Sequence, residues 1–337
     1  MASAALASAA QEGLTPETEG SAVLPRLLEL RAFLEKSLIG GQTLVERLLV
    51  ALLSDGHVLI EGAPGLAKTR AVKLLAEGLD APLSRIQCTP DLMPADLTGT
   101  SVWRPDRGVF EFVAGPIFHS LVLVDEINRA PPKVQSALLE AMAERQTTAA
   151  GVTHKLPDPF MVAATQNPIE HEGTFPLPEA QLDRFMLHAE VKAPDAAAER
   201  AILDLVEEEG IAGPPPPAAR LSAQDVRAAR RAAQAVYLSP AVRDYIVRLT
   251  SSLRGTALPD LARKIEHPPS PRGAIALARG AKARAFLHGR DHATPQDVAE
   301  LAVDTLSHRL ILAWRAVADG ATPRSVVLEL LDAVEPH

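Results

Sequence analysis

The stretch HVLIEGAPGLAKT, residues 57–69, predicts a strand, a loop and the start of a helix in direct succession. Residues 57–60 form an apolar run, the loop contains two glycines, and apolar residues return with the helical period over 70–79. This order is the context in which a phosphate-binding loop is expected. The backbone N–H groups of residues 64–69 would then surround phosphate oxygens at a helix N-terminus, where the helix dipole favours anions.

Two side chains in this stretch would act on a nucleotide. Lys68 would reach the β- and γ-phosphates, and the hydroxyl of Thr69 would hold Mg²⁺. The pattern G-x-x-x-x-G-K-[ST] has glycine where this chain has Ala67, but Gly65 can supply the permissive backbone, so the methyl group is tolerable. The alternative interpretation is an ordinary glycine–proline turn. The expected phosphate-binding residues are Gly62, Ala63, Pro64, Gly65, Leu66, Ala67, Lys68 and Thr69.

Composition limits the class of protein. The chain has 337 residues, 47% of them hydrophobic, which suits two globular domains with their own cores. Its net charge of −8 argues against a general attraction to nucleic acid or anionic lipid, without excluding a local basic pore. The single cysteine, Cys88, excludes an intramolecular disulfide framework and fits a reduced, cytoplasmic setting. Every apolar run is shorter than the roughly 18 residues of a membrane span.

The pattern of elements divides the chain into three parts. Residues 1–20 carry neither Lys nor Arg, so they lack the basic start of a secretory signal, and we expect a disordered tail. Strands alternate with helices over 21–193, which predicts an α/β domain whose parallel sheet is covered on both faces. After Pro194 there is no convincing strand, and alanine- and leucine-rich helices predict a helical domain over 194–337. Two hairpins are expected as inserts, near 98–118 and 145–157.

Two acids follow a strand in LVLVDEINRA, residues 121–130. In a parallel sheet the end of this strand would lie beside the phosphate loop. Asp125 would hold the Mg²⁺ hydration shell, and Glu126 would polarise the attacking water. The alternative is a solvated strand end.

Three further polar residues are candidates for the same chemistry. Asn167 ends the apolar strand predicted at 160–165 and would contact the γ-phosphate or the water, although Asn-Pro is also a common turn. Arg184 and Arg272 are candidates to neutralise phosphoryl charge, Arg184 from a neighbouring subunit and Arg272 from a mobile lid. A surface ion pair is the more common role of any single arginine.

GAPGLAKT, LVDEINRA, the strand ending in Asn167 and LPEAQLDRF together resemble the AAA+ ATPases of the MoxR family, over about residues 22–330. The resemblance implies an αβα core with strand order 5-1-4-3-2, an all-helical lid and a ring, usually a hexamer. It assigns Lys68 and Thr69 to Walker A and Asp125 and Glu126 to Walker B. Asn167 matches sensor 1, Arg184 the arginine finger, with Arg129 as an alternative, and Arg272 sensor 2. Gly40 and Gln42 match the segment near the adenine.

The same resemblance implies hydrolysis of ATP with Mg²⁺ and chaperone-like remodelling of partner proteins, with von Willebrand factor A domain proteins as expected partners. The two hairpins resemble elements that face the central channel. Trp103, Phe110, Phe112 and His154 would contact a client there, or would simply pack the inserts. The alternatives are a nucleic-acid motor, which the acidic balance disfavours, and a nucleotide-gated scaffold with little turnover, which the Asp125–Glu126 pair disfavours.

Overall fold

The computed structural model describes residues 16–149, 151–168, 173–217, 219–255 and 257–336. Most of the tail expected at 1–20 therefore lies outside the described residues. Residues 16–20 do not belong to a tail, because helix α2 spans Pro16–Ser37. Val23, Leu27, Leu30 and Leu34 are buried at the spacing of one helical face, and this face holds the helix against the rest of the molecule.

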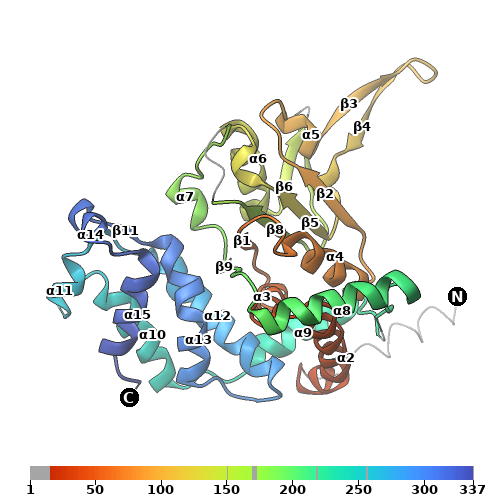
Figure 1. Cartoon of the computed structure of the whole chain (residues 1–337). Helices are drawn as coiled ribbons and strands as arrows, with labels where there is room; N and C mark the ends of the chain where they lie inside the picture. The colour runs from red at the N-terminus through yellow and green to blue at the C-terminus, as the bar shows by residue number, and fades with distance from the viewer. Residues whose placement is uncertain (1–15, 150, 169–172, 218, 256, 337) are drawn as a thin grey trace, which may run out of the picture.

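The core is a five-stranded parallel sheet (Figure 1). Its strands are β1 (Val58–Glu61), β2 (Leu83–Gln87), β5 (Leu121–Asp125), β8 (Met161–Gln166) and β9 (Leu187–Glu190). They lie in the order β2-β5-β8-β1-β9, with every neighbouring pair parallel. Counting the core strands alone, this order is 5-1-4-3-2, so the predicted topology is confirmed. The carboxyl ends of all five strands meet at one edge of the sheet.

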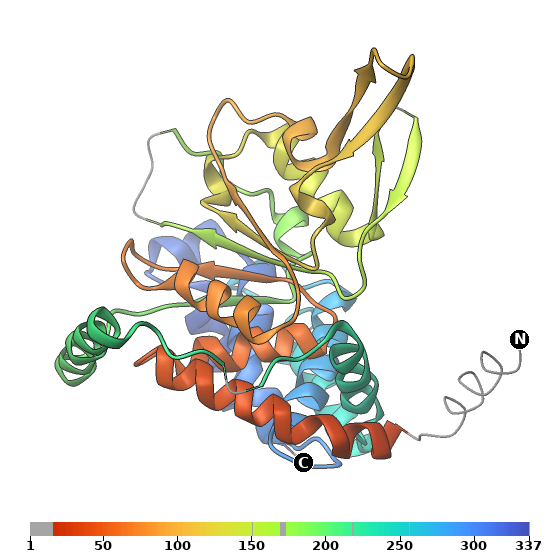
Figure 2. The ribbon, with the colours of Figure 1, turned by 90° about the vertical axis from the view of Figure 1, so that its right-hand side faces the viewer.

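Alternate residues of the strands enter two separate apolar cores, as the two-residue period of a strand requires. Val58 and Ile60 join one core, together with residues of α2, α3 (Gln42–Leu53) and α4 (Lys68–Gly78). Leu59 joins the other, with residues of α5 (Pro94–Thr98), η1 (Pro116–Phe118) and α6 (Pro132–Glu144). Figures 1 and 2 show α2 and α3 on one side of the sheet and α6 on the other. The expected αβα layering is confirmed.

The part after Pro194 is helical, as predicted, with one addition. Its helices are α8 (Ala196–Ala212), α9 (Ala223–Ala235), α10 (Pro240–Ser252), α11 (Pro259–Ala262), α12 (Pro271–Leu287), α13 (Pro295–Leu306), η3 (Ser307–Arg309), α14 (Trp314–Ala318) and α15 (Pro323–Ala333). The strands β10 (Ile265–His267) and β11 (Ile311–Leu312) pair antiparallel, so the expectation of no strand here was wrong. Segments of two or three residues are too short to show an alternating pattern in the sequence. None of the helices within the described ranges has both the length and the apolar character of a membrane span.

Both predicted hairpins are present. The first consists of β3 (Gly99–Arg104) and β4 (Val109–Ala114), and it projects away from the core (Figure 1). The second consists of β6 (Gln146–Ala149) and β7 (Val152–Lys155), with residue 150 outside the described residues. The remaining short elements are η2 (Ile127–Arg129) and α7 (Glu179–Leu182).

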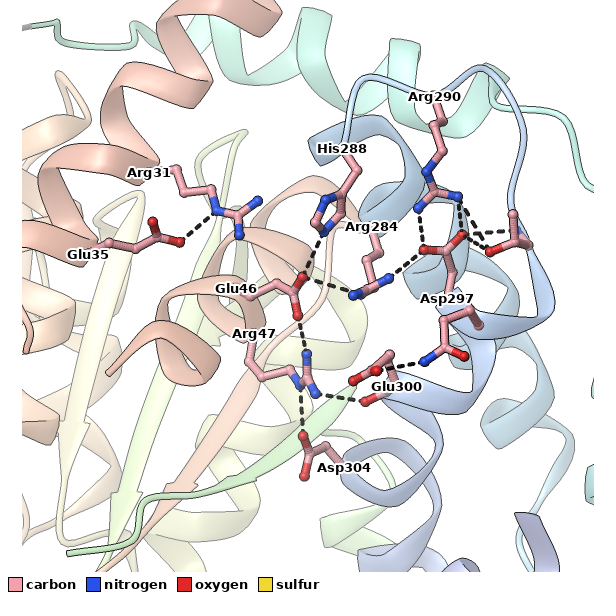
Figure 3. Close-up of polar contacts among 12 residues, drawn as sticks. Arg31, Glu35, Glu46, Arg47, Arg284, His288, Arg290, Asp297, Glu300 and Asp304 are labelled. Carbon is pink, nitrogen blue, oxygen red and sulfur yellow. Dashed lines mark hydrogen bonds and ion pairs between the residues drawn. The ribbon is translucent and has the colours of Figure 1, made fainter. Parts of the chain in front are cut away.

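Ion pairs join α3 of the core to α12 and α13 (Figure 3). Glu46 of α3 lies 3.2 Å from Arg284, which in turn lies 2.7 Å from Asp297. The neighbouring Arg47 pairs with Asp304 of α13 at 2.7 Å. These side chains are largely buried, and the apolar core on this side of the sheet is continuous from α3 into α12 and α13. The ion pairs and the shared core therefore fix α12 and α13 in one position against α3.

Candidate nucleotide-binding site

A cavity of about 660 Å³ lies beside the loop that joins β1 to α4. Residues 64–69 form one wall, and the ends of β2, β5 and β8 form another. Further residues of α4, together with Glu209 of α8 and Pro214, complete the lining. The cavity brings together most of the predicted site, because Asp125, Glu126 and Asn167 line it with the loop. It occupies the crevice outside the carboxyl ends of parallel strands, where ligands of open α/β sheets bind.

The backbone of the loop has the shape that a phosphate cradle requires. Gly65 adopts φ +83° and Ala67 φ +52°, both in the region that favours glycine. A Cβ at Gly62 would meet the carbonyl oxygen of Val191 at 2.8 Å, so the first glycine is also needed for close packing. The Nζ atom of Lys68 donates to the carbonyl oxygens of Gly62 and Ala63, the second at 3.2 Å. The carbonyl groups of Gly62 and Ala63 thus hold the ammonium group of Lys68, which lines the cavity.

Oxygen donors suited to Mg²⁺ meet at Asp125. The Thr69 hydroxyl donates to Asp125 Oδ2 at 3.2 Å, and Thr165 Oγ1 donates to Oδ1 at 2.6 Å. Burial would raise the pKa of Asp125, but the hydrogen bonds from Thr165, Arg85 and Thr69 and the charge of Arg85 lower this pKa below its usual value. The carboxylate is therefore ionised at neutral pH. A hydroxyl beside an ionised carboxylate matches the hard oxygen ligands that Mg²⁺ prefers, so Thr69 and Asp125 fit the ion.

Glu126 has a strained backbone. Its φ is +56°, which is uncommon for a residue with a side chain, and its N–H donates to Thr165 Oγ1 at 3.0 Å. Its Oε2 accepts hydrogen bonds from Gln87 at 3.0 Å and from Arg129 at 3.1 Å. Such strain persists where the surroundings enforce it, commonly at functional sites. The turn after β5 is what allows two adjacent acids to reach one cavity.

Asn167 follows β8 at the edge of the sheet, next to the acids. It is 4% exposed and lines the cavity, and its backbone carbonyl accepts from the Asn128 side chain at 3.4 Å. This is the place that the order of motifs predicts.

The described residues that line the cavity do not include Arg184 or Arg272. Arg184 donates to the carbonyl oxygen of Leu139, and Arg272 Nη1 lies 3.5 Å from Asp183 Oδ2. Arg272 therefore lies against Asp183, whereas the guanidinium of the adjacent Arg184 lies against α6. Among the described residues, Arg272 does not close the cavity of its own chain, so its contact with a nucleotide stays a prediction. Arg129, by contrast, lies against Glu126 of its own chain.

Gly40 and Gln42 are not part of the lining within the described ranges either. Gly40 has φ +74° and faces α8, where a Cβ would lie 3.6 Å from that of Ala198. Gln42 begins α3 and is exposed. Arg70 of α4 links this segment to the cavity, because its guanidinium contacts both the Ser37 carbonyl and the Glu209 carboxylate.

Several polar side chains of the cavity were not predicted from the sequence, among them Thr165, Arg85, Gln87 and Glu209. A signal was present for two of them. Arg85 and Gln87 are alternate polar residues within the short strand LSRIQ, so they point to the same face, at the strand end nearest the acids. Cys88, which follows them, is buried, and burial together with the charges of Asp125 and Glu126 raises the pKa of its thiol to about 12.

The four side chains expected to face a channel fall into two groups. Phe112 and His154 stack with ring centroids 3.9 Å apart, so they pack the two hairpins against each other. Trp103 and Phe110 pair across the β3–β4 hairpin at 5.1 Å, yet they remain 49% and 72% exposed. Only the second group offers apolar surface to another molecule.

Comparison with known proteins places the chain in a family. Residues 57–187 match the ATPase family associated with various cellular activities (AAA), and residues 261–330 match an AAA lid domain. The chain is 43% identical to "Chaperone MoxR1" of Mycobacterium tuberculosis, across 97% of this chain and 87% of that protein. It is 33% identical to "Protein MoxR" of Methylorubrum extorquens, across 82% and 85%. A crystal structure of a protein from Cytophaga hutchinsonii superposes with a TM-score of 0.86 at 38% identity, covering 95% of this chain and 98% of that one. The chain belongs to the MoxR family of AAA+ ATPases.

Proposed function

We propose that this protein hydrolyses ATP to ADP and phosphate in a Mg²⁺-dependent reaction and uses the energy to remodel client proteins. The observation that carries the proposal is the position of Glu126. An acid held in a strained conformation by Thr165, Gln87 and Arg129 faces the same cavity as Lys68 and Thr69. A site that only bound nucleotide would not need a carboxylate in this place.

Each residue then has a distinct task. The N–H groups of 64–69 and the ammonium of Lys68 bind phosphate oxygens, and Asn167 orients the γ-phosphate or the attacking water. Glu126 accepts a hydrogen bond from that water and takes up its proton as the water oxygen bonds to the γ-phosphorus, while the bond from this phosphorus to the β–γ bridging oxygen breaks and ADP leaves. When bound by Thr69 and Asp125, Mg²⁺ supplies neutralisation of the phosphate charge.

The two arginines support assembly into a ring. Arg272 lies against Asp183 and Arg184 against Leu139, and neither is among the described residues that line the cavity of their own chain. We infer that both enter the cavity of a neighbouring copy in a homo-oligomer, which we propose to be a hexamer. Arg129 is bound to Glu126 of its own chain, so we assign the role of the arginine finger to Arg184 and not to Arg129.

The clients we propose are proteins. The exposed Trp103 and Phe110 at the end of the β3–β4 hairpin support this, because aromatic side chains are enriched where proteins bind one another. The relative from M. tuberculosis is named a chaperone. Family resemblance makes proteins with a von Willebrand factor A domain the first clients to test, in the cytoplasm.

The proposal is tested by steady-state ATP hydrolysis measured against protein concentration, with Glu126→Gln as the blank. We expect the specific activity to rise with concentration and then saturate, because assembly completes the site. A rate no higher than the blank, with and without client protein, would contradict the proposal and favour a nucleotide-gated scaffold. Stimulation by duplex DNA and not by client protein would favour a nucleic-acid motor.

A further inference from the structure

Strand β2 carries two polar side chains that reach the acids after β5. Arg85 donates to Asp125 Oδ2 from Nη2 at 2.7 Å and from Nε at 3.2 Å. Its Nη2 also donates to Gln87 Oε1 at 2.9 Å, and Gln87 Nε2 donates to Glu126 at 3.0 Å. The guanidinium is thus bonded directly to one acid and linked through an amide to the other.

The two oxygens of Asp125 have different neighbours. Oδ1 accepts the short bond from Thr165, whereas Thr69 Oγ1 lies closer to Oδ2, at 3.2 Å against 3.5 Å. Arg85 is bonded to Oδ2, the oxygen on the side of Thr69. Oδ2 is therefore the oxygen of Asp125 that a metal ion at Thr69, or a water of its hydration shell, would most readily reach. Arg85 and a metal ion at this place would therefore compete for one carboxylate oxygen.

The charge of the cavity gives Arg85 a second effect. Four basic and four acidic side chains are among the described residues that line it, so their formal charges cancel. Without Arg85 the acids would be in excess by one charge, which would weaken the attraction of the cavity for the negative phosphates of a nucleotide. Its side chain is 47% exposed, so the guanidinium has room to move from the carboxylate toward a phosphate.

We propose that Arg85 is a built-in counter-ion of Asp125, which lets the cavity accept nucleotide phosphates without metal and competes with Mg²⁺ for the carboxylate. Arg85 is then a positioning residue that sets how strongly nucleotide affinity depends on Mg²⁺. The inference rests on the proposed nucleotide site but not on hydrolysis. A protein that fails to bind nucleotide would overturn the proposed function; one that binds it without the dependence described below would overturn only the role of Arg85.

The test compares the affinity for a fluorescent, non-hydrolysable ATP analogue in EDTA and in excess Mg²⁺. The dissociation constant in EDTA divided by the dissociation constant in Mg²⁺ measures how much the metal improves binding. We expect Arg85→Gln to raise this ratio about tenfold, mainly by weakening binding in EDTA. The change is no larger because solvent partly screens a half-exposed charge pair. An unchanged ratio would show that Arg85 is only structural. A lower ratio would show that it orients Asp125 for the metal, and either result overturns the proposal.

Two further variants separate charge from structure. Arg104→Gln removes an arginine that pairs with Glu111 at 2.7 Å in the β3–β4 hairpin, with a similarly exposed side chain, and should leave the ratio unchanged. Arg85→Lys keeps the positive charge and should stay within about threefold of the wild-type ratio, a change smaller than the charge effect. If the lysine variant changes the ratio as much as the glutamine variant, charge is not the cause. If Arg85→Gln does not fold, the ratio measured for Arg85→Lys against that of the wild type still tests the proposal.

Discussion

The hydroxyl of Thr165 donates to the carboxylate of Asp125 at 2.6 Å and accepts from the backbone N–H of Glu126 at 3.0 Å. One buried oxygen atom from β8 therefore fixes the side chain of the acid that would hold Mg²⁺ and the backbone of the acid that would activate water. The two acids belong to β5 and its following turn, so their joint geometry depends on a neighbouring strand.

We expect Thr165→Val to lower the turnover number by about 10- to 100-fold, the range observed when a partner that orients a metal ligand is lost. Nucleotide affinity should change by less than about threefold, because the hydroxyl of Thr165 is hydrogen-bonded to the two acids and not to a phosphate-loop residue in the described part of the chain. Turnover and analogue binding would be measured on the same preparations. Thr165→Ser keeps the hydroxyl and should retain most of the activity. Equal losses in both variants would show that packing, and not the hydroxyl, matters here.

We expect Arg184→Ala to bind ATP and assemble but to lose turnover by about a thousandfold, the lower end of the range for a trans-acting arginine. Arg184→Ala subunits keep Glu126, and Glu126→Gln subunits keep Arg184. Mixing the two inactive variants should therefore restore hydrolysis at the interfaces that combine the intact residues. The rate would be followed across mixing ratios. Mixtures that remain inactive, although subunit exchange is demonstrated, would contradict the assignment of Arg184.

Much of the core could be predicted because its signals are local. A strand, a glycine-containing loop and a helix are contiguous in residues 57–78, and the acids and Asn167 follow apolar strands, so the parallel sheet brings them to one edge. The expected hairpins were also found, because turn residues between short apolar pieces are a local pattern.

The parts of the site that were not predicted depend on tertiary contacts, which cannot be inferred from any single segment of the sequence. In the sequence Thr165 is only one more residue of a buried strand. The pairing of β8 with β5 is what brings its hydroxyl within hydrogen-bond distance of Asp125. The sequence around Arg272 predicts a helix start but not where the lid lies. Ion pairs between α3 and α12–α13 fix the C-terminal helices, and this arrangement keeps Arg272 at Asp183 and off the cavity lining of the described residues.

Ala67 offers a test of the loop backbone. Its left-handed φ of +52° costs a residue with a Cβ roughly 1–2 kcal/mol, whereas glycine adopts it freely but loses about 0.5–1 kcal/mol of chain entropy on folding. We expect Ala67→Gly to raise the free energy of unfolding by about 0.5–1 kcal/mol, measured by urea denaturation. Ala71→Gly, one turn later within α4, should instead lower it by about 1 kcal/mol. If both variants change the free energy of unfolding in the same direction, the backbone at Ala67 is not strained.

Asp297 belongs to the ion pairs that fix the C-terminal helices, where it pairs with Arg284 and Arg290. Burial by itself would raise the pKa of Asp297, but hydrogen bonds from Arg290, Thr294 and Arg284 lower this pKa to about 2. The folded pKa is below the ordinary value of 3.8, so the stabilisation is fully present above about pH 4 and is lost as pH falls toward 2. It amounts to about 2 kcal/mol in the free energy of unfolding.

Asp297→Asn tests this assignment. At pH 7 the variant should be less stable than the wild type by about 3–5 kcal/mol, because Arg284 and Arg290 would lose a buried partner. Between pH 4 and pH 2 the difference should shrink, since the wild-type carboxylate becomes protonated there and the amide does not titrate. Denaturant unfolding at several pH values measures both quantities. A difference that stays constant down to pH 2 would mean that Asp297 does not titrate with the lowered pKa, and that another acid carries the pH dependence of the contact between α12 and α13.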